Sequence, residues 1–351
     1  MYRLISGFAN YYIVITFMKK ITIRDVAREA GVSITLVSFV MNAKRDENGH
    51  LDCCVNQDTA KRVLEVARRL GYRRNQAAAS LRSGRSKTIA VITSDIANPF
   101  FSEICRYIEN IAYTSDYTVI MASSDEKAEK LGRLIDTMFG YNVEGMIVAP
   151  SPGSEALLQK VVDNNIPTVL IDRDLKGDAF GRVMVDNVNA GSMAANHLLK
   201  KGYKKIEMIS YNLGISSFAD REAGYKKAME SAGLAQMAKV RFVSYTNMAD
   251  DIVAIIEDAL KRKVEALVLP SKKISVAGIN ALNLLGAKYP DDMDLVCFDE
   301  SDVYEINKPI VSHIVQPVEE IGEKAFEVLL NMIAGHNEGK DVLLQAKIHC
   351  E

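Results

Sequence analysis

The stretch IRDVAREAGVS, residues 23–33, decides the fold of the N-terminal part of the chain. Its apolar residues recur at helical spacing and predict a helix over residues 23–30; they are Val26, Ala27 and Ala30. Thr22 can cap this helix, and Asp25, three residues further on, gives an acidic variant of the capping-box pattern. Gly31 takes a positive φ without steric cost, so we expect a tight turn directly after the helix.

Two further helices are predicted after this turn. Ser33 would cap a helix from residue 34 to about residue 41. Residues 43–55 are polar and contain Asn48-Gly49, a turn signal, so we expect a loop or a hairpin there. A third helix is predicted from about residue 57 to residue 70, and it would bury Val63, Ala67 and Leu70. Two helices joined by a short glycine turn form the helix-turn-helix arrangement.

Residues 18–72, which we call the head, resemble the head of the lactose-repressor (LacI/GalR) family. The segment 23–33, then Val37-Ser38 and Asn42, matches that family's pattern in order and spacing. A helix-turn-helix pattern alone is moderately specific, and it gains weight at the start of a chain of 351 residues. The resemblance implies that the second helix enters the major groove of DNA. The predicted DNA contacts of the head are Thr22, Ser33, Ile34, Thr35, Ser38, Phe39 and Asn42.

The side chain expected to read bases is unusual at one position. Phe39 stands where the family often has arginine. A phenyl ring cannot donate a hydrogen bond to guanine, but it can pack against a thymine methyl group. We therefore predict a near-palindromic operator with TA-containing half-sites and a flexible central step. Basic side chains would instead meet phosphates and add affinity without sequence information; they are Lys19, Lys20, Arg24, Arg73, Arg82 and Arg85.

The charge distribution agrees with a nucleic-acid-binding head. The formal net charge is only -2, but residues 19–88 hold 15 Lys and Arg against 7 Asp and Glu, whereas residues 89–351 hold 27 against 38. A basic first quarter on an acidic body fits a part that binds a polyanion. The alternative is a basic face that is merely solvated.

Residues 73–87 resemble the family's hinge, whose pattern is Asn-x-x-Ala-x-x-Leu. Residues 77–81 favour a helix, but five residues do not stay helical alone in water, so two copies would have to order together on DNA as a homodimer. The resemblance implies that Leu81 wedges between base pairs from the minor groove; the alternative is an ordinary linker leucine. Arg74 replaces the usual proline and predicts a more flexible hinge. The predicted DNA contacts of the hinge are Asn75, Ala78, Leu81 and Arg82.

Short apolar strands alternate with helical stretches from residue 87 onward. The predicted strands are Thr88–Ile92, Tyr117–Ala122, Gly145–Ala149, Thr168–Ile171, Lys205–Ile209, Ala266–Leu269 and Leu295–Phe298. This alternation indicates parallel sheets covered on both faces, and the number of elements exceeds one sheet. The predicted fold class is α/β, with an N-terminal all-α helix-turn-helix head and a two-lobed body of parallel sheets.

The body also resembles this family, and the periplasmic sugar-binding proteins related to it. The matching pieces run in family order and are Asp95–Phe101, Ile171–Arg173, Val185–Asn187, Arg221–Tyr225, Phe298–Asp299 and Val315–Pro317. The resemblance implies three crossings between two lobes, near residues 187, 313 and 335. The predicted effector-binding and dimerisation domain is 88–351, with lobe 1 at about 88–186 and 314–334 and lobe 2 at about 187–313 and 335–351.

Ligands of open parallel sheets bind at the carboxyl ends of strands, where several polar and aromatic residues of this chain fall. Asp172 and Asp299 can each accept two hydroxyl hydrogen bonds, which suits a polyol, and Phe100 and Tyr245 offer apolar faces to a sugar ring. For Asp172 the alternative is a buried pair with Arg173. The predicted effector-binding residues are Asn98, Phe100, Ser124, Asp172, Arg173, Arg221, Tyr245, Ser271, Asp299 and Gln316.

Some of these positions carry further expectations. The resemblance implies that Arg221 contacts sugar or acid oxygens. Ser271-Lys272-Lys273 stands where the family commonly has Asn-Asp, and lysine there favours an anionic ligand such as a uronate or a sugar phosphate. The alternative is that Lys272 points into solvent. Asp186 and Asn187 are expected to cap the helix that follows them.

The N-terminus and the cysteines bear on the cellular location. Residues 1–17 are apolar, with Arg3 as their only charge, and no cleavage site of small residues follows. We expect a disordered extension or a mis-chosen start before Met18; a membrane anchor is the alternative. The scattered cysteines form no disulfide framework and favour a reducing cytoplasm; they are Cys53, Cys54, Cys105, Cys297 and Cys350. His50, Cys53 and Cys54 lack a fourth ligand for zinc, so no metal and no cofactor are expected.

The sequence therefore predicts a cytoplasmic transcription regulator, a repressor whose homodimer binds an operator under allosteric control by a small sugar or sugar acid. An enzyme is the first alternative, but no dinucleotide fingerprint, P-loop, nucleophile elbow or His-Glu-x-x-His motif is present, and His197 fits helix packing better than catalysis. A solute-binding receptor is the second, and it would need an export signal and no basic head. The effector can either release the protein from DNA or promote its binding, and both alternatives stay open. The tail shows no leucine heptads, which favours a dimer over a tetramer.

Overall fold

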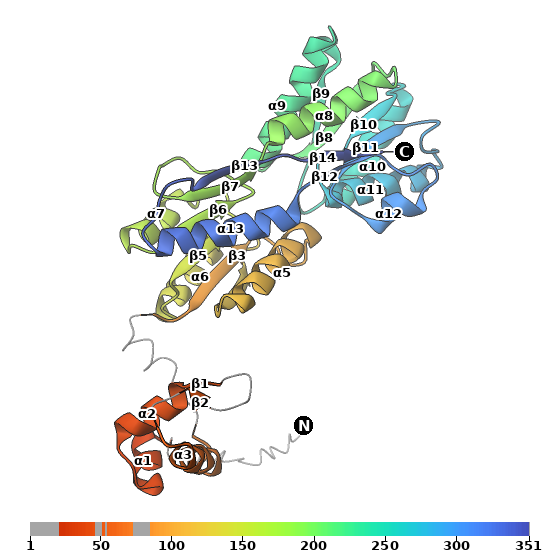
Figure 1. Cartoon of the computed structure of the whole chain (residues 1–351). Helices are drawn as coiled ribbons and strands as arrows, with labels where there is room; N and C mark the ends of the chain where they lie inside the picture. The colour runs from red at the N-terminus through yellow and green to blue at the C-terminus, as the bar shows by residue number, and fades with distance from the viewer. Residues whose placement is uncertain (1–20, 46–50, 53–54, 73–84, 351) are drawn as a thin grey trace, which may run out of the picture. The chain divides into compact units, whose positions relative to one another are not determined.

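The computed structural model describes residues 21–45, 51–52, 55–72 and 85–350. The chain divides into two compact units, Met1–Arg85 and Ser86–Glu351 (Figure 1). The predicted extension at 1–17 and the residues considered for zinc, His50, Cys53 and Cys54, lie outside the described residues.

Three helices form the first unit, as the sequence predicts: α1 (Ile23–Ala30), α2 (Ile34–Asn42) and α3 (Gln57–Arg69). The Asp25 carboxylate accepts hydrogen bonds from the backbone nitrogen and the hydroxyl of Thr22, at 3.0 and 2.7 Å. Ser33 Oγ accepts from the backbone nitrogen of Leu36 at 3.1 Å, and so caps α2. The helices enclose a small core of their own, made of Val26, Ala27, Ala30, Val37, Val40, Ala60, Val63, Val66 and Ala67.

The polar insertion between α2 and α3 contains a hairpin. Strands β1 (Lys44–Arg45) and β2 (Leu51–Asp52) pair in antiparallel fashion. Of the two expected forms of this segment, a loop or a hairpin, the structure adopts the hairpin.

The first lobe of the second unit is a six-stranded sheet in the order β13-β7-β6-β5-β3-β4, with all its neighbours parallel. Its strands are β3 (Thr88–Thr93), β4 (Thr118–Ser123), β5 (Gly145–Val148), β6 (Thr168–Ile171), β7 (Gly181–Val185) and β13 (Asp341–Leu344). Its helices are α5 (Pro99–Thr114), α6 (Ala128–Gly140), α7 (Glu155–Asp163) and α13 (Val318–Ile333). Side chains alternate between the faces: Ile89 and Val91 pack with α5 and α13, whereas Ala90 and Ile92 pack with α6 and α7.

The second lobe repeats this design with the sheet order β14-β12-β11-β10-β8-β9, in which only β14 is antiparallel to its neighbour. Its strands are β8 (Ile206–Tyr211), β9 (Lys239–Val243), β10 (Ala266–Val268), β11 (Asp294–Phe298), β12 (His313–Val315) and β14 (Lys347–His349). Its helices are α8 (Asn187–Lys200), α9 (Ser216–Ser231), the 3-10 turn η1 (Ala235–Met237), α10 (Met248–Lys261), α11 (Lys272–Leu285) and α12 (Asp302–Ile306). Helices α8 and α9 cover one face of the sheet, and α10 and α11 cover the other.

The chain crosses between the lobes three times, and the third crossing differs from the prediction. The first crossing leads from β7 into α8, and the second from β12 into α13. The third was expected near residue 335, but β13 pairs with β7 in the first lobe and β14 pairs with β12 in the second. The crossing therefore falls after Leu344, because the residues beyond α13 add one more strand to the first sheet before they leave it.

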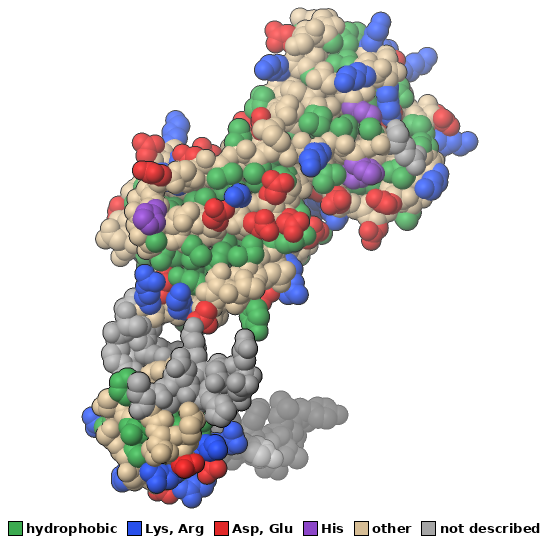
Figure 2. All heavy atoms as spheres, in the orientation of Figure 1, with side chains coloured by type: hydrophobic (Ala, Val, Ile, Leu, Met, Phe, Trp, Pro, Cys, Tyr) green, Lys and Arg blue, Asp and Glu red, His purple; other side chains and the backbone are tan. Residues whose placement is uncertain are grey.

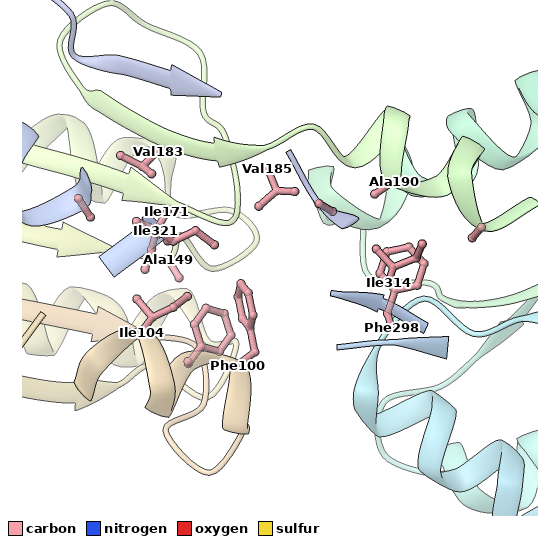
Figure 3. Packing of buried hydrophobic residues seen from close by; sticks show 14 of the residues in the cluster. Phe100, Ile104, Ala149, Ile171, Val183, Val185, Ala190, Phe298, Ile314 and Ile321 are labelled. Atoms are coloured by element: carbon pink, nitrogen blue, oxygen red, sulfur yellow. The ribbon is translucent and has the colours of Figure 1, made fainter. Parts of the chain in front are cut away.

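One buried apolar cluster runs through both lobes beside these crossings. Figure 3 shows Phe100, Ile104 and Ile171 at its first-lobe end and Phe298 and Ile314 at its second-lobe end. Val185 lies between them at the end of β7, and Ala190 follows in α8 on the second-lobe side of the first crossing. The lobes are thus joined by a packed core as well as by the chain. Within the described ranges, no helix is long and apolar enough to span a membrane.

Candidate functional site

The exposed face of α2 carries the residues predicted to read DNA. Phe39 has 62 % of its surface exposed and Ile34 has 45 %, whereas Val37 and Val40 on the opposite face are buried. Ser38 is half-buried, and its hydroxyl accepts a hydrogen bond from Asn42 Nδ2 at 3.2 Å. The other predicted contacts of the head are exposed as well; they are Thr22, Ser33 and Thr35. A face of this kind can meet base edges without disturbing the core of the head.

Basic side chains surround this part of the chain. Figure 2 shows Lys and Arg side chains mainly along the lower edge and the sides of the first unit, with a few Asp and Glu among them. Arg28 pairs with Asp25 at 2.8 Å, and Arg69 pairs with Glu29 at 2.7 Å. Arg24 and Arg85, predicted phosphate contacts, are exposed. The remaining predicted contacts lie outside the described residues; they are Lys19, Lys20, Arg73 and the hinge residues Asn75, Ala78, Leu81 and Arg82.

A cavity of about 480 Å³ lies between the two lobes. Nine of the ten predicted effector-binding residues line it: Asn98, Phe100, Asp172, Arg173, Arg221, Tyr245, Ser271, Asp299 and Gln316. The tenth, Ser124, does not reach the cavity. Its hydroxyl is buried against the backbone oxygen of Thr93 at 3.3 Å and the hydroxyl of Ser151 at 2.9 Å. Ser124 therefore supports the wall from behind.

An ion network built on Arg173 forms the first-lobe side of the cavity. The guanidinium binds both carboxylate oxygens of Glu126, at 2.5 and 2.6 Å, and its Nε donates to Asp172 at 3.1 Å. Arg173 Nη1 also donates to the backbone oxygen of Pro150 at 2.9 Å. The alternative considered for Asp172, a buried pair with Arg173, is thus present, and it leaves Asp172 on the cavity surface. Burial raises the pKa of Asp172 above its usual value, and the Arg173 charge opposes that rise.

Arg221 forms the corresponding feature of the second lobe. It is only 3 % exposed, and its Nε donates to Asn187 Oδ1 at 2.8 Å. Its two terminal nitrogens donate to the backbone oxygen of Pro270 at 2.6 Å and to Gln316 Oε1 at 3.1 Å. The guanidinium carbon also lies 4.7 Å from the ring centre of Phe298. Burial lowers the pKa of Arg221, because the charged form has lost its water.

Asn187 therefore has a different role from the predicted one. Asp186 caps α8, since its carboxylate accepts from the backbone nitrogen of Asn189 at 2.9 Å. Asn187 is the first residue of that helix and orients Arg221 instead.

Two further contacts fix the carboxylate of Asp299. Gln316 Nε2 donates to one of its oxygens at 2.6 Å, and the backbone nitrogen of Lys272 donates to the other at 3.0 Å. Asp299 and Asp172 both follow a strand and both have a left-handed backbone, with φ of 65° and 64°. The lobes thus present one acid each, at equivalent turns.

Aromatic rings complete the second-lobe wall. Tyr211 lies edge-on to Phe218, with ring centres 5.3 Å apart, and it tilts against Tyr245 at 5.7 Å. The ammonium group of Lys273 lies 4.5 Å from the ring centre of Tyr245. From the first lobe, Phe100 faces the same cavity. Sugar rings commonly bind on such apolar faces, which leave the hydroxyl groups free to meet polar side chains.

Sequence reasoning missed several residues of this site, among them Glu126, Tyr211 and Phe218. Glu126 follows directly on the Ser123-Ser124-Asp125 turn that the sequence did indicate, so its position after a strand was an available signal. Tyr211 ends β8 and faces the cavity, but its strand reads as an ordinary buried one. Phe218 lies on α9 one turn before Arg221, and nothing in its neighbourhood marks it.

Arg221 is placed by an unusually close contact between α8 and α9. A Cβ atom on Gly224 would lie 1.9 Å from the backbone oxygen of Val188, and one on Gly191 would lie 2.0 Å from the backbone oxygen of Arg221. Only glycine permits this approach. The two glycines thus set the depth at which Arg221 enters the cavity.

The described residues give no sign of a metal centre. Nowhere among them do three His, Cys, Asp or Glu side chains gather in a way that could hold a metal ion. Cys105 and Cys297 are buried and Cys350 is exposed, all three as free thiols.

A helix-turn-helix head joined to two parallel-sheet lobes around one cavity defines a class of ligand-binding transcription regulators. Residues 86–351 match the periplasmic binding proteins and sugar binding domain of the LacI family, and residues 22–75 match the bacterial regulatory proteins of the lacI family. The chain belongs to the LacI family of DNA-binding transcription regulators.

Named relatives support this membership. The HTH-type transcriptional regulator RegA of Clostridium saccharobutylicum is 32 % identical over 89 % of this chain and 92 % of its own length. Catabolite control protein A of Priestia megaterium is 30 % identical over 88 % and 91 %. A crystal structure of a LacI-family transcriptional regulator from Silicibacter pomeroyi superposes with a TM-score of 0.75, at 25 % identity, over 94 % of this chain and 98 % of that one. These relatives are regulators of transcription rather than enzymes.

Proposed function

We propose that this chain is a repressor that binds a near-palindromic operator as a homodimer, and that a small sugar-like effector in the interlobe cavity sets its affinity for DNA. The compartment that holds the DNA, the cytoplasm, is its proposed location. The observation that carries the proposal is the composition of the cavity, whose polar lining residues come from both lobes.

Gln316 bonds the chain segment between the lobes to the second lobe. Its amide oxygen accepts from Arg221 and its amide nitrogen donates to Asp299, both of the second lobe. Gln316 itself lies at the second crossing, two residues before α13 of the first lobe begins. A ligand that contacts Arg221, Asp299 and Asp172 together would therefore hold the lobes in one arrangement. Such a ligand can change DNA affinity only through its different affinities for the two arrangements of the lobes.

The homodimer follows from how such heads read DNA. One three-helix head offers a single α2 and so contacts one half-site, whereas two heads related by a two-fold axis read a near-palindrome. The same symmetry would bring two hinges, each with its own Leu81, to the centre of the operator.

Binding of genomic DNA fragments by the full-length protein tests the proposal. A mobility-shift assay in the presence and absence of a panel of sugars should give specific fragments whose affinity changes with one of the sugars. The variant Arg221→Met should keep the DNA affinity of the ligand-free protein and lose the response, because the guanidinium lies in the cavity and not in the head. A protein that binds all fragments and random duplex equally, under every condition, would contradict the proposal.

A further inference from the structure

The interlobe cavity is electrically polarised. Its first-lobe wall carries three acids, Asp95, Glu126 and Asp172, against one base, Arg173. Its second-lobe wall carries one acid, Asp299, against three bases, which are Arg221, Lys272 and Lys273. The cavity as a whole is nearly neutral, but its two sides have opposite charge. A ligand that bridges the lobes meets both sides at once.

The positive side has one acid, Asp299, whose charge acts on Arg221 without a direct ion pair. Arg221 is nearly fully buried, and all its hydrogen bonds go to uncharged acceptors: an asparagine, a backbone carbonyl and a glutamine. Within the described part of the chain it makes no ion pair, and three bonds leave two of its five N–H groups. Burying a guanidinium without a directly bonded carboxylate is costly, so an anion that enters the cavity and binds Arg221 would relieve that cost.

The two lysines lie where a helix normally prefers acids. Lys272 and Lys273 are the first two residues of α11, and the first turn of this helix contains no acidic residue. The start of a helix has a partial positive charge, which disfavours lysine and attracts anions. Three sources of positive potential, the guanidinium, the ammonium groups and the helix start, thus meet on one wall.

Asp299 neutralises only part of this wall, because it is one acid against three bases. Both of its oxygens are already bonded, one to Gln316 and the other to the backbone nitrogen of Lys272. The negative wall opposite offers acceptors instead: Asp172 lines the cavity, and its Oδ2 accepts from Arg173 while its carboxylate has further lone pairs for hydroxyl donors.

We propose that the effector is an acidic sugar derivative, whose carboxylate or phosphate group binds the Arg221–Lys272–Lys273 wall while its hydroxyl groups donate to Asp172 and Asp95. This inference rests on the proposed function and narrows it to one class of ligand. The aromatic rings of Phe100 and Tyr245 fit the carbon face of the same sugar.

Calorimetry with the full-length protein at constant ionic strength tests the charge requirement. One matched set is D-glucose, D-glucuronate and D-glucose 6-phosphate, a second is the galactose series, and inorganic phosphate probes the charge alone. We expect phosphate to bind in the millimolar range, and the acids or phosphates of at least one series to bind at least tenfold more tightly than the neutral sugar. Comparison of the two acidic arms distinguishes a carboxylate from a phosphate. A neutral sugar that binds more tightly than its acids, or no binding by any anion, would overturn the inference.

A pair of charge variants locates the binding. The double variant Lys272→Met, Lys273→Met should weaken the binding of the anion at least tenfold more than it weakens the binding of the neutral sugar. The exposed Lys226 and Lys227 on α9 do not line the cavity, and their double Met variant is the matched control. An equal loss in the control would assign the effect to overall charge and refute the site.

The DNA assay keeps this result separate from the proposed function. Intact preference for anions in a protein without DNA affinity would refute the regulator and leave the ligand class standing. Specific DNA binding together with a preference for neutral sugars would refute the acidic ligand class and leave the proposed regulator standing.

Discussion

Phe39 presents an apolar ring at a position where a hydrogen-bonding side chain could read guanine. Phe39 and the partly exposed Ile34 place two apolar side chains on the predicted base-reading face of the head, beside the polar Thr35. For these two side chains, apolar contact with thymine methyl groups is the chemistry available. Recognition would then depend on few bases and on the ease with which the operator deforms.

We predict that Phe39→Ala relaxes the base preference rather than the overall affinity. Loss of the ring removes the thymine contact, so the preference for the best operator over a variant without that thymine should fall by about fivefold, or about 1 kcal/mol. A binding series over single-base operator variants measures this ratio. An equal loss of affinity on all variants would show that Phe39 acts through the fold of the head.

A second residue gives a pH dependence of stability. Burial lowers the pKa of His197, the charges of Lys201 and Lys200 lower it further, and Asp294 opposes them. The unfolded chain, with a histidine pKa of about 6.5, therefore binds a proton here more readily than the folded protein does. Folding free energy is lost as the pH falls below about 6.5, and His197→Leu should escape this loss.

Thermal unfolding of both proteins between pH 7 and pH 5 measures the effect. The difference in midpoint, variant minus wild type, should rise by about 2 °C on acidification. His336 is exposed, and His336→Leu provides the control in which this difference stays constant. If the difference in midpoint also stayed constant for His197→Leu, burial of the His197 ring would not be the cause of a pH-dependent stability.

At the scale of elements, the pair α8 and α9 couples packing to ligand binding. Gly224→Ala places a Cβ atom against the backbone of α8, so the helices must separate and Arg221, one turn earlier on α9, must move with them. We expect a destabilisation of about 3 kcal/mol and a loss of ligand affinity. Chemical denaturation and calorimetry measure the two effects.

Gly140→Ala is the matched control for this variant. Gly140 lies in α6, and a Cβ atom there would meet nothing within 4 Å. Alanine should leave stability unchanged or raise it by up to about 1 kcal/mol. Gly224→Ala behaving like this control would mean that the helices can adjust to the added methyl group.

The same elements show what sequence patterns predict. The seven predicted strands and the three helices of the head are present with nearly the predicted bounds, because they are short apolar runs or clearly capped helices. Strands β7, β9, β12, β13 and β14 were not predicted. Strands β9, β13 and β14 are partly exposed, and β12 has only three residues, so none forms an apolar run that stands out from its flanks. The misplaced third crossing follows from the missed β13.

The candidate site also contains residues that the sequence predicts and residues that it does not. Polar residues after strands were predictable, since strand ends share one edge of a sheet. Ser124 also follows a strand, but its side chain turns inward, and that orientation depends on the neighbouring Thr93 and Ser151. The partner of Arg173, Glu126, lies 47 residues away in the chain, and no local pattern connects the two.

At the scale of the molecule, the two units have separate cores. The apolar cluster of the head shares no residue with the clusters of residues 86–351. We predict that residues 86–351 alone fold and bind the effector with the affinity of the whole protein, but do not bind DNA. Calorimetry and a mobility-shift assay check the two halves of this expectation.

Scanning calorimetry adds a second readout. The full chain should unfold in more than one transition, and residues 86–351 should reproduce the later or larger one. Effector at a concentration 100 times its dissociation constant should stabilise that transition by about 2.7 kcal/mol. Failure of the shorter chain to fold would show that the head is needed for the stability of the body.

The three connections between the lobes limit how the body can move. We expect a joint of three chain segments to bend more easily about one axis than it twists, as in the hinge closure of other two-lobed proteins. The state of the body can then be described by a single opening angle. Two spectroscopic labels, one on each lobe, would suffice to follow that angle during binding. Effectors of different chemistry could then be compared by the opening angle that each of them produces.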